Sequence, residues 1–156
     1  MDGLTFREGG LEELERDLIK AISKTPVQAE ETLKELAKEF MESAKARAET
    51  ELNPHERKGE QKKKAIKKKW GTKIVEEGVE IAALIWNSAR HFHLVENGHN
   101  LVKDGKVIGF VSGKHIMEKT REEYREIVPE RFEEMVDDIL KGSGLNSVSY
   151  THLRAH

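Results

Sequence analysis

The spacing of apolar residues changes twice along the chain, and this change limits the fold class. In the N-terminal part, apolar residues recur every three or four positions, as on one face of a helix: Leu11, Leu14, Leu18 and Ile22, then Leu33, Leu36, Ala37, Phe40 and Ala44. From Gly71 to Gly113 the chain is instead rich in β-branched residues and turn sequences. Helical spacing returns after Gly113, through Tyr124, Val128, Phe132, Met135 and Ile139. This order predicts an α+β fold with a helical N-terminal half, a small antiparallel sheet and a closing C-terminal helix.

The N-terminal half is expected to contain two helices, within residues 11–50. Acidic residues near the start suit the N-terminus of a first helix. Thr25 followed by Pro26 has the residue types of an N-cap and a first helical position, so this pair predicts the start of a second helix. Asn53 stands before a proline and predicts its end. A basic linker is expected over residues 51–70.

The middle of the chain, residues 71–113, predicts about four strands in hairpins. The stretch "TKIVEEGVEIAALIWNS" is typical of two strands with a turn at Gly78. The stretch "LVKDGKVIGFV" gives the strongest hairpin signal, because Asp104-Gly105 is a favoured two-residue turn with apolar residues on both sides.

A closing helix is predicted over residues 114–141, and Pro129 should kink it or split it in two, since proline lacks the backbone donor. No internal repeat is visible, and 156 residues suit one domain, which we assign to residues 1–144. Residues 145–156 follow none of these patterns and resemble translated adapter read-through. We expect a disordered or non-native tail there.

Composition restricts the chemistry. The absence of cysteine excludes disulfides and thiolate metal sites, and no stretch approaches the roughly 18 apolar residues of a membrane span. The first residues show no secretory signal, so we expect a cytoplasmic protein. The formal net charge is only −2, but basic residues gather between Arg57 and Lys69, while acidic residues dominate the first fifty positions and the segment from Glu118 to Asp138.

The segment "HFHLVENGH" is the first candidate site. Its histidines, His91, His93 and His99, could bind zinc, because catalytic zinc sites commonly use three protein ligands. In a helix His91 and His93 would lie roughly 200° apart, and in a strand His99 would need a fold-back to join them. We therefore expect no metal site, and a zinc-dependent hydrolase remains a rival hypothesis.

No motif of an enzyme is visible elsewhere. "GFVSGKH" looks like a phosphate-binding loop, but only three residues separate Gly109 from Gly113, and His115 follows Lys114 where a hydroxyl residue is needed. Paired carboxylates occur without a nucleophile or an oriented histidine beside them. We expect no catalytic residue, no cofactor and no enzymatic activity.

The basic segment is the second candidate site. Its lysines would spread around most of a helical wheel: Lys62, Lys63, Lys64, Lys67, Lys68 and Lys69. Such a surface can meet an acidic partner, or it can bind nucleic-acid phosphates in a sequence-independent, salt-dependent manner. A small nucleic-acid-binding module is therefore the alternative function.

"HFHLVENGH", the following "DGKVIGFVSGKH" and the terminal helix together resemble the small tail-component family of long-tailed, siphovirus-type bacteriophages, which are tail-completion or head-tail joining proteins. The matching motif residues are His91, Phe92, His93, Leu94, Val95, Glu96, Gly98 and His99. With this resemblance they are interpreted as a structural joint, in which apolar side chains anchor in the core and Gly98 allows a sharp turn.

The resemblance also implies a function and partners. It implies a structural subunit without catalysis that forms a ring, a hexamer, at the head-proximal end of a tail. The implied partners are connector or adaptor proteins and tail-tube proteins, with non-specific DNA contact allowed in the ring lumen. The implied location is the tail or neck of the virion, and the host bacterial cytoplasm during assembly.

Overall fold

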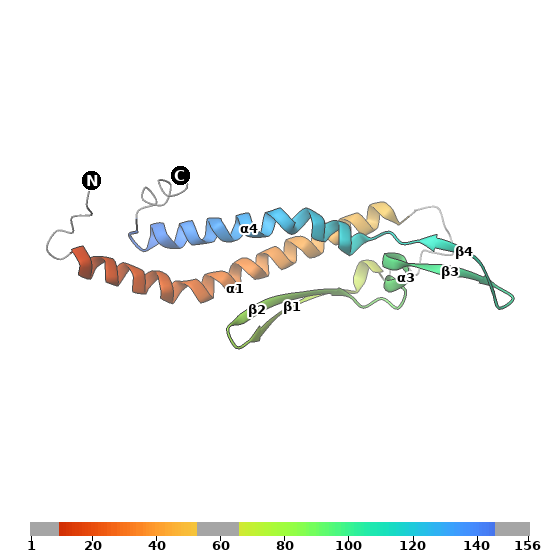
Figure 1. Cartoon of the computed structure of the whole chain (residues 1–156), viewed down its shortest axis with the longest axis horizontal. Helices are drawn as coiled ribbons and strands as arrows, with labels where there is room; N and C mark the ends of the chain where they lie inside the picture. The colour runs from red at the N-terminus through yellow and green to blue at the C-terminus, as the bar shows by residue number, and fades with distance from the viewer. Residues whose placement is uncertain (1–9, 53–65, 146–156) are drawn as a thin grey trace. The chain divides into compact units, whose positions relative to one another are not determined.

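The computed structural model describes residues 10–52 and 66–145 (Figure 1). The elements are, in order, α1 (Gly10–Glu51), β1 (Trp70–Glu77), β2 (Glu80–Asn87), α3 (Phe92–Asn97), β3 (Gly98–Lys103), β4 (Lys106–Ser112) and α4 (Ile116–Gly142). The predicted α+β class is confirmed. The chain divides into two compact units, one made of the stretches up to Thr32 and from Pro129 onward, the other of Leu33–Val128.

The N-terminal region is one helix of 42 residues, so the prediction of two helices is wrong. Pro26 lies inside α1 and offers no N–H to the carbonyl four residues earlier. Thr25 does not begin a second helix but donates its hydroxyl back to the Ala21 carbonyl oxygen, at 2.7 Å. Ala21 and Ala29, on either side of the proline, both belong to the apolar core shared with α4. This shared packing offsets the cost of about 3 kcal/mol that an interior proline carries.

The unit formed by the two ends of the chain has a small core of its own. In it, the N-terminal part of α1 and the C-terminal part of α4 lie side by side (Figure 1). The buried residues are Ala21, Met135 and Ile139, covered by Ala29, Phe132 and Leu145. α4 continues through Pro129, so the predicted division of this helix into two is wrong. A kink of the helix at Pro129 stays a prediction.

The C-terminus of α4 ends in a left-handed turn. Gly144 has a φ of 85°, and the Leu145 amide donates to the Leu140 carbonyl at 2.9 Å, as in a Schellman motif. Residues 146–156, most of the predicted tail, lie outside the described residues.

The four described strands form two separate hairpins, not the single sheet expected. β1 pairs with β2, and β3 pairs with β4, both antiparallel. Both predicted turns are present: Gly78 has a φ of 62°, and Asp104 and Gly105 have φ values of 52° and 74°. α3 stands between the hairpins in the chain. Strand pairing within a hairpin follows from local turns, whereas pairing between hairpins depends on contacts that no turn sequence encodes.

The Leu33–Val128 unit has a second core. Its buried residues come from α1, from the segments flanking β1 and β2, and from the start of α4: Ala44, Ala48, Ile66, Ala89 and Ile116. Small alanines on α1 allow other elements to approach the helix closely. Partly buried apolar residues complete this core: Phe40, Leu52, Trp70, Phe92, Val95 and Met117.

Candidate functional site

The candidate motif forms a short helix, α3, that is anchored by two apolar side chains. Phe92 and Val95 pack against the core of the Leu33–Val128 unit. The Phe92 ring meets the Trp70 ring edge-on, with centroids 5.4 Å apart and planes inclined by 74°. His91 and His93 are exposed. The motif thus alternates between side chains that anchor α3 and side chains that face solvent.

Two glycines meet where β3 begins and β4 ends. Gly98 has a φ of 81°, a left-handed conformation that favours glycine. A Cβ atom on Gly98 would overlap the carbonyl oxygen of Val111 and would lie 2.8 Å from the nitrogen of Gly113. A Cβ atom on Gly113 would overlap the carbonyl oxygen of Glu96 and would lie 2.8 Å from the nitrogen of Gly98. The two backbones therefore pack directly against each other, and no side chain fits between them.

The side chain of Glu96 binds the N-terminus of α4. The Met117 amide donates to both carboxylate oxygens, at 3.0 and 3.1 Å, and the Glu118 amide donates to Oε1 at 3.1 Å. The His115 amide donates to the Glu96 carbonyl oxygen at 3.2 Å. A carboxylate in this place satisfies amides that have no partner inside the helix and complements the positive end of the helix dipole. Glu96 thus fixes α3 to the start of α4.

The three histidines of the motif do not converge on one point. His91 precedes α3 and His93 lies within it, and both side chains are exposed, while His99 lies in β3, half-buried, with a buried Nδ1 that has no hydrogen-bond partner among the described residues. Within residues 10–52 and 66–145, no group of three His, Cys, Asp or Glu side chains could hold a metal ion. The rival zinc site gains no support from the described part of the chain.

The basic segment is only partly described. Lys62, Lys63 and Lys64 lie outside the described residues. The side chains of Lys67, Lys68 and Lys69 are exposed. The Lys67 ammonium lies 3.4 Å from the Glu49 carboxylate of α1, and both side chains are about half exposed, 48% and 47%. One lysine of the segment therefore meets an acidic residue of the same chain.

A row of polar contacts, which sequence reasoning missed, joins α1 to the start of α4. The Arg47 guanidinium donates to Glu123 at 2.8 Å and to the Thr120 hydroxyl at 3.3 Å. One turn further along α1, the Lys119 ammonium donates to Glu51 at 2.8 Å. This hydrogen bond lowers the pKa of the Glu51 carboxyl below its ordinary value. In the sequence, only the high content of charged residues in α1 and α4 pointed to such contacts, and charge alone does not show which residues pair.

A comparison with protein families identifies the chain. A family model described as "Bacteriophage HK97-gp10, putative tail-component" matches residues 12–98, more than half of the chain. The chain belongs to the HK97-gp10 family. The suspected relationship to phage tail components is thereby confirmed. Comparisons with curated proteins and with solved structures gave no match.

The match to the HK97-gp10 family begins near the start of α1 and ends at Gly98. It includes β1, β2 and α3, whereas most of the β3–β4 hairpin and all of α4 follow it. As a phage tail component, the protein interacts with other structural proteins of the phage and is located in the virion. This family supports a structural role rather than an enzymatic one. None of the described helices is both long enough and apolar enough to cross a membrane.

Proposed function

We propose that this HK97-gp10 family protein is a tail-completion or head-tail joining component, which forms a ring at the head-proximal end of the tail. The observation that carries the proposal is the family match over residues 12–98. The resemblance of the "HFHLVENGH" motif to tail-completion proteins supports the more specific role, and it supports a hexameric ring.

The geometry around α3 supports a subunit that must keep a fixed shape in a ring. Glu96 fixes α3 to α4, and the contact between Gly98 and Gly113 fixes the base of the β3–β4 hairpin. We infer that motif residues 91–96, 98 and 99 act as a structural joint that sets the direction of the hairpin. Residues 1–144 then act as one functional domain, with the connector or adaptor and the tail-tube proteins as partners.

The proposal is tested in a phage that carries this gene. Deleting the gene should give filled heads and separate tails in electron micrographs, and the wild-type gene supplied in trans during assembly in the host cytoplasm should restore joined virions. A virion preparation from the complemented phage should contain the protein at the neck, as seen by labelling an epitope-tagged copy. Complete, joined virions in the absence of the protein would contradict the proposed role.

A nucleic-acid contact remains the alternative, because the side chains of Lys68 and Lys69 are exposed at the end of the basic segment. Such binding would weaken steeply with salt, since lysines that neutralise phosphates release counterions. Fluorescence anisotropy with a labelled duplex at several salt concentrations tests it. Replacing Lys62, Lys63 and Lys64 by alanine should abolish binding. The matched control replaces Lys20, Lys24 and Lys38 of α1, and equal loss in both variants would contradict a specific role for the basic segment.

A further inference from the structure

The β3–β4 hairpin leaves large apolar side chains in water. Among the described residues, those exposed on it are Leu101, Val102, Val107, Ile108, Phe110 and Val111. An isolated two-stranded hairpin is only marginally stable in water, and a contiguous exposed apolar surface commonly marks an interaction site. The hairpin therefore offers a surface that gains stability when something covers it.

The strand register places the most exposed of these side chains together. Val102 is paired with Val107, and Phe110 lies two pairs further along on the same face. Ile108 has no partner in the register, because a bulge falls between Leu101 and Val102, and as the direct neighbour of Val107 in β4 it belongs to the same exposed surface. Val102, Val107, Ile108 and Phe110 are each 61–65% exposed, and we call them the hairpin patch.

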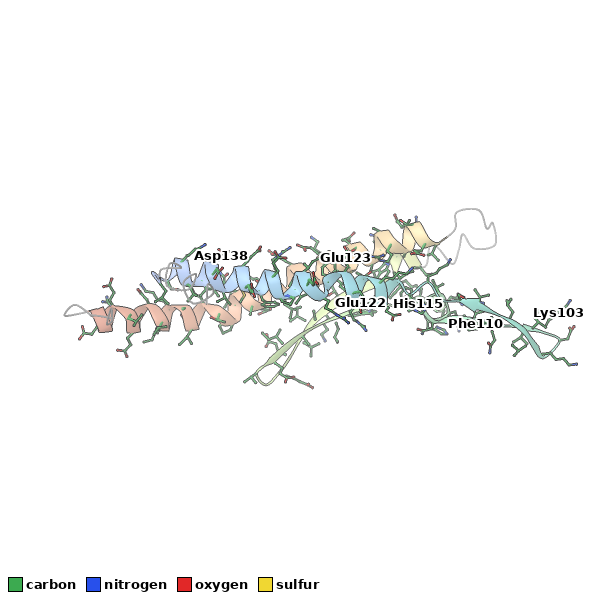
Figure 2. All side chains as sticks on the ribbon, turned by 45° about the horizontal axis from the view of Figure 1, so that its top comes forward. Lys103, Phe110, His115, Glu122, Glu123 and Asp138 are labelled. Atoms are coloured by element: carbon green, nitrogen blue, oxygen red, sulfur yellow. The ribbon has the colours of Figure 1, made fainter. Side chains whose placement is uncertain are left out.

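The hairpin patch has lysines at one end. Lys103 and Lys106 flank the turn, and Lys103 lies at the tip of the hairpin in Figure 2. Asp104 is the only acidic residue between Gly98 and Ser112, so this segment has a net charge of +1.

A second exposed apolar surface lies on α1, in the other unit. Leu18, Ile19 and Ile22 are 44%, 59% and 69% exposed, and their spacing places them within about 100° of the helix circumference. Glu15 and Glu12 are exposed about one and two turns earlier on the same side of α1. We call Leu18, Ile19 and Ile22 the α1 stripe.

The charges around the two surfaces are opposite. The segment from Gly10 to Thr32 holds six acidic and three basic side chains, a net charge of −3. Two hairpin patches that meet would both belong to segments of net positive charge, and two α1 stripes to segments of net negative charge, whereas a patch and a stripe belong to segments of opposite charge. Like charges across an interface are unfavourable, so a patch meeting a stripe is the pairing that the charges favour.

We propose that the hairpin patch of one copy docks on the α1 stripe of a second copy, with Lys103 and Lys106 facing Glu12 and Glu15. The contact joins two different surfaces, so repeating it generates a ring or an open filament. This inference rests on the proposed function only in taking a second copy of the chain as the partner. It adds to that function the two surfaces through which subunits assemble.

Crosslinking can test the contact directly, because the chain has no cysteine. Full-length Ile19→Cys and Val107→Cys variants are mixed and treated with a short bis-maleimide. We expect a crosslinked dimer that contains one copy of each variant, and a ladder of higher multimers from the Ile19→Cys/Val107→Cys double variant. The matched control is Lys24→Cys, which is exposed on the opposite side of α1 and should crosslink with Val107→Cys at least fivefold less.

A charge exchange tests the orientation of the docked surfaces. Replacing Lys103 and Lys106 by glutamate should reduce the mixed crosslink about tenfold, since it places like charges across the contact. Adding Glu12→Lys and Glu15→Lys to the Ile19→Cys partner should restore the crosslink. Failure of this restoration would overturn the proposed orientation.

Other outcomes overturn the contact without deciding the function. Efficient crosslinking of Val107→Cys with itself would show a hairpin-to-hairpin contact. An oligomer in light scattering without the mixed crosslink would mean that subunits meet through other surfaces. A monomer without any crosslink would overturn contact between copies and leave another phage protein as the occupant of the hairpin patch. The proposed function fails only if heads and tails join without the protein.

Discussion

Glu96 binds the Met117 amide through both carboxylate oxygens, at 3.0 and 3.1 Å, although the two residues lie 21 positions apart in the chain. The contact replaces the local capping residue that helices commonly carry at their N-terminus. Here the residue directly before α4 is His115, whose φ is 51° and whose ring Nδ1 lies 2.9 Å from the Glu118 carboxylate. The N-terminus of α4 is therefore satisfied by a side chain from another element.

Removing the Glu96 side chain should destabilise the protein. Glu96→Ala leaves the Met117 and Glu118 amides without their acceptor, and we expect the free energy of unfolding to fall by about 1–2 kcal/mol. Glu96→Gln keeps one acceptor oxygen but loses the charge, so its cost should be smaller. Urea unfolding followed by circular dichroism measures both. The control is Glu126→Ala, an exposed acidic residue of α4. If Glu96→Ala unfolds at the same urea concentration as this control, the capping role is wrong.

Substituting the glycines should separate steric overlap from backbone strain. Gly113→Ala places a methyl group against backbone atoms of Glu96, Asn97 and Gly98, which cannot move aside as a flexible side chain can. We expect a loss of roughly 2–3 kcal/mol, in the range of overpacked sites. Gly98→Ala adds an unfavourable positive φ to its overlap, so its loss should be larger.

Two further glycines serve as controls for these substitutions. Gly78 has a φ of 62° but open space around its Cα atom, so Gly78→Ala reports the backbone strain alone, about 1 kcal/mol. Gly142 has open space as well and lies outside the left-handed region of φ, so Gly142→Ala should not destabilise the protein. The urea concentration at the unfolding midpoint should be lowest for Gly98→Ala and should rise through Gly113→Ala and Gly78→Ala to Gly142→Ala. A Gly113→Ala variant as stable as Gly142→Ala would contradict the close backbone contact.

Features specified within a few residues could be predicted from the sequence. The turn at Asp104 and Gly105 was predicted correctly, because the preference for positive φ at both positions is a property of the two residues themselves. The contact of Glu96 with Met117 could not be predicted, since nothing in the motif names a partner 21 positions away. The motif residues were found by resemblance, but the reason for a glutamate at position 96 required the structure.

The error at Pro26 has the same origin. Thr25 and Pro26 have the local signature of a helix start, and local preference favours an interruption there. The chain nevertheless continues as α1, because Ala21 shares a core with Ile139, more than 100 positions away. Local preferences, even the cost of about 3 kcal/mol for a proline inside a helix, yield to tertiary packing of this kind, and sequence patterns do not record such packing.

The ion pair between Glu51 and Lys119 should make stability depend on pH. Because the hydrogen bond from Lys119 lowers the pKa of Glu51 in the folded state, the pair stabilises the protein above the ordinary glutamate pKa of about 4.3 and loses this effect as pH falls below it. Glu51→Gln should therefore cost about 0.5 kcal/mol at pH 7, a value typical of a partly exposed pair, and almost nothing at pH 3. Urea unfolding of both proteins at the two pH values measures the difference. An equal difference at both pH values would contradict the effect, as would an insensitivity to salt.

The hydroxyl group of Thr120 should contribute to the free energy of unfolding, because it takes part in two hydrogen bonds. It is fully buried, donates to the Ile116 carbonyl oxygen at 2.7 Å and accepts from the Arg47 guanidinium at 3.3 Å. Thr120→Val keeps the shape of the side chain but removes the acceptor for a charged donor, so we expect a loss of about 1–2 kcal/mol.

A matched control for this substitution exists in α1. Thr50 also donates to the carbonyl oxygen four residues earlier, at 3.0 Å, but its side chain is exposed to solvent instead of buried. Thr50→Val should change the free energy of unfolding by less than about 0.5 kcal/mol, as expected for a surface site. Combining Thr120→Val with Arg47→Met should give a loss smaller than the sum of the single losses, because both substitutions remove the same hydrogen bond. If the two single losses add exactly, Arg47 and Thr120 act independently. The contact between α1 and α4 in this unit would then depend on the ion pair of Arg47 with Glu123 instead.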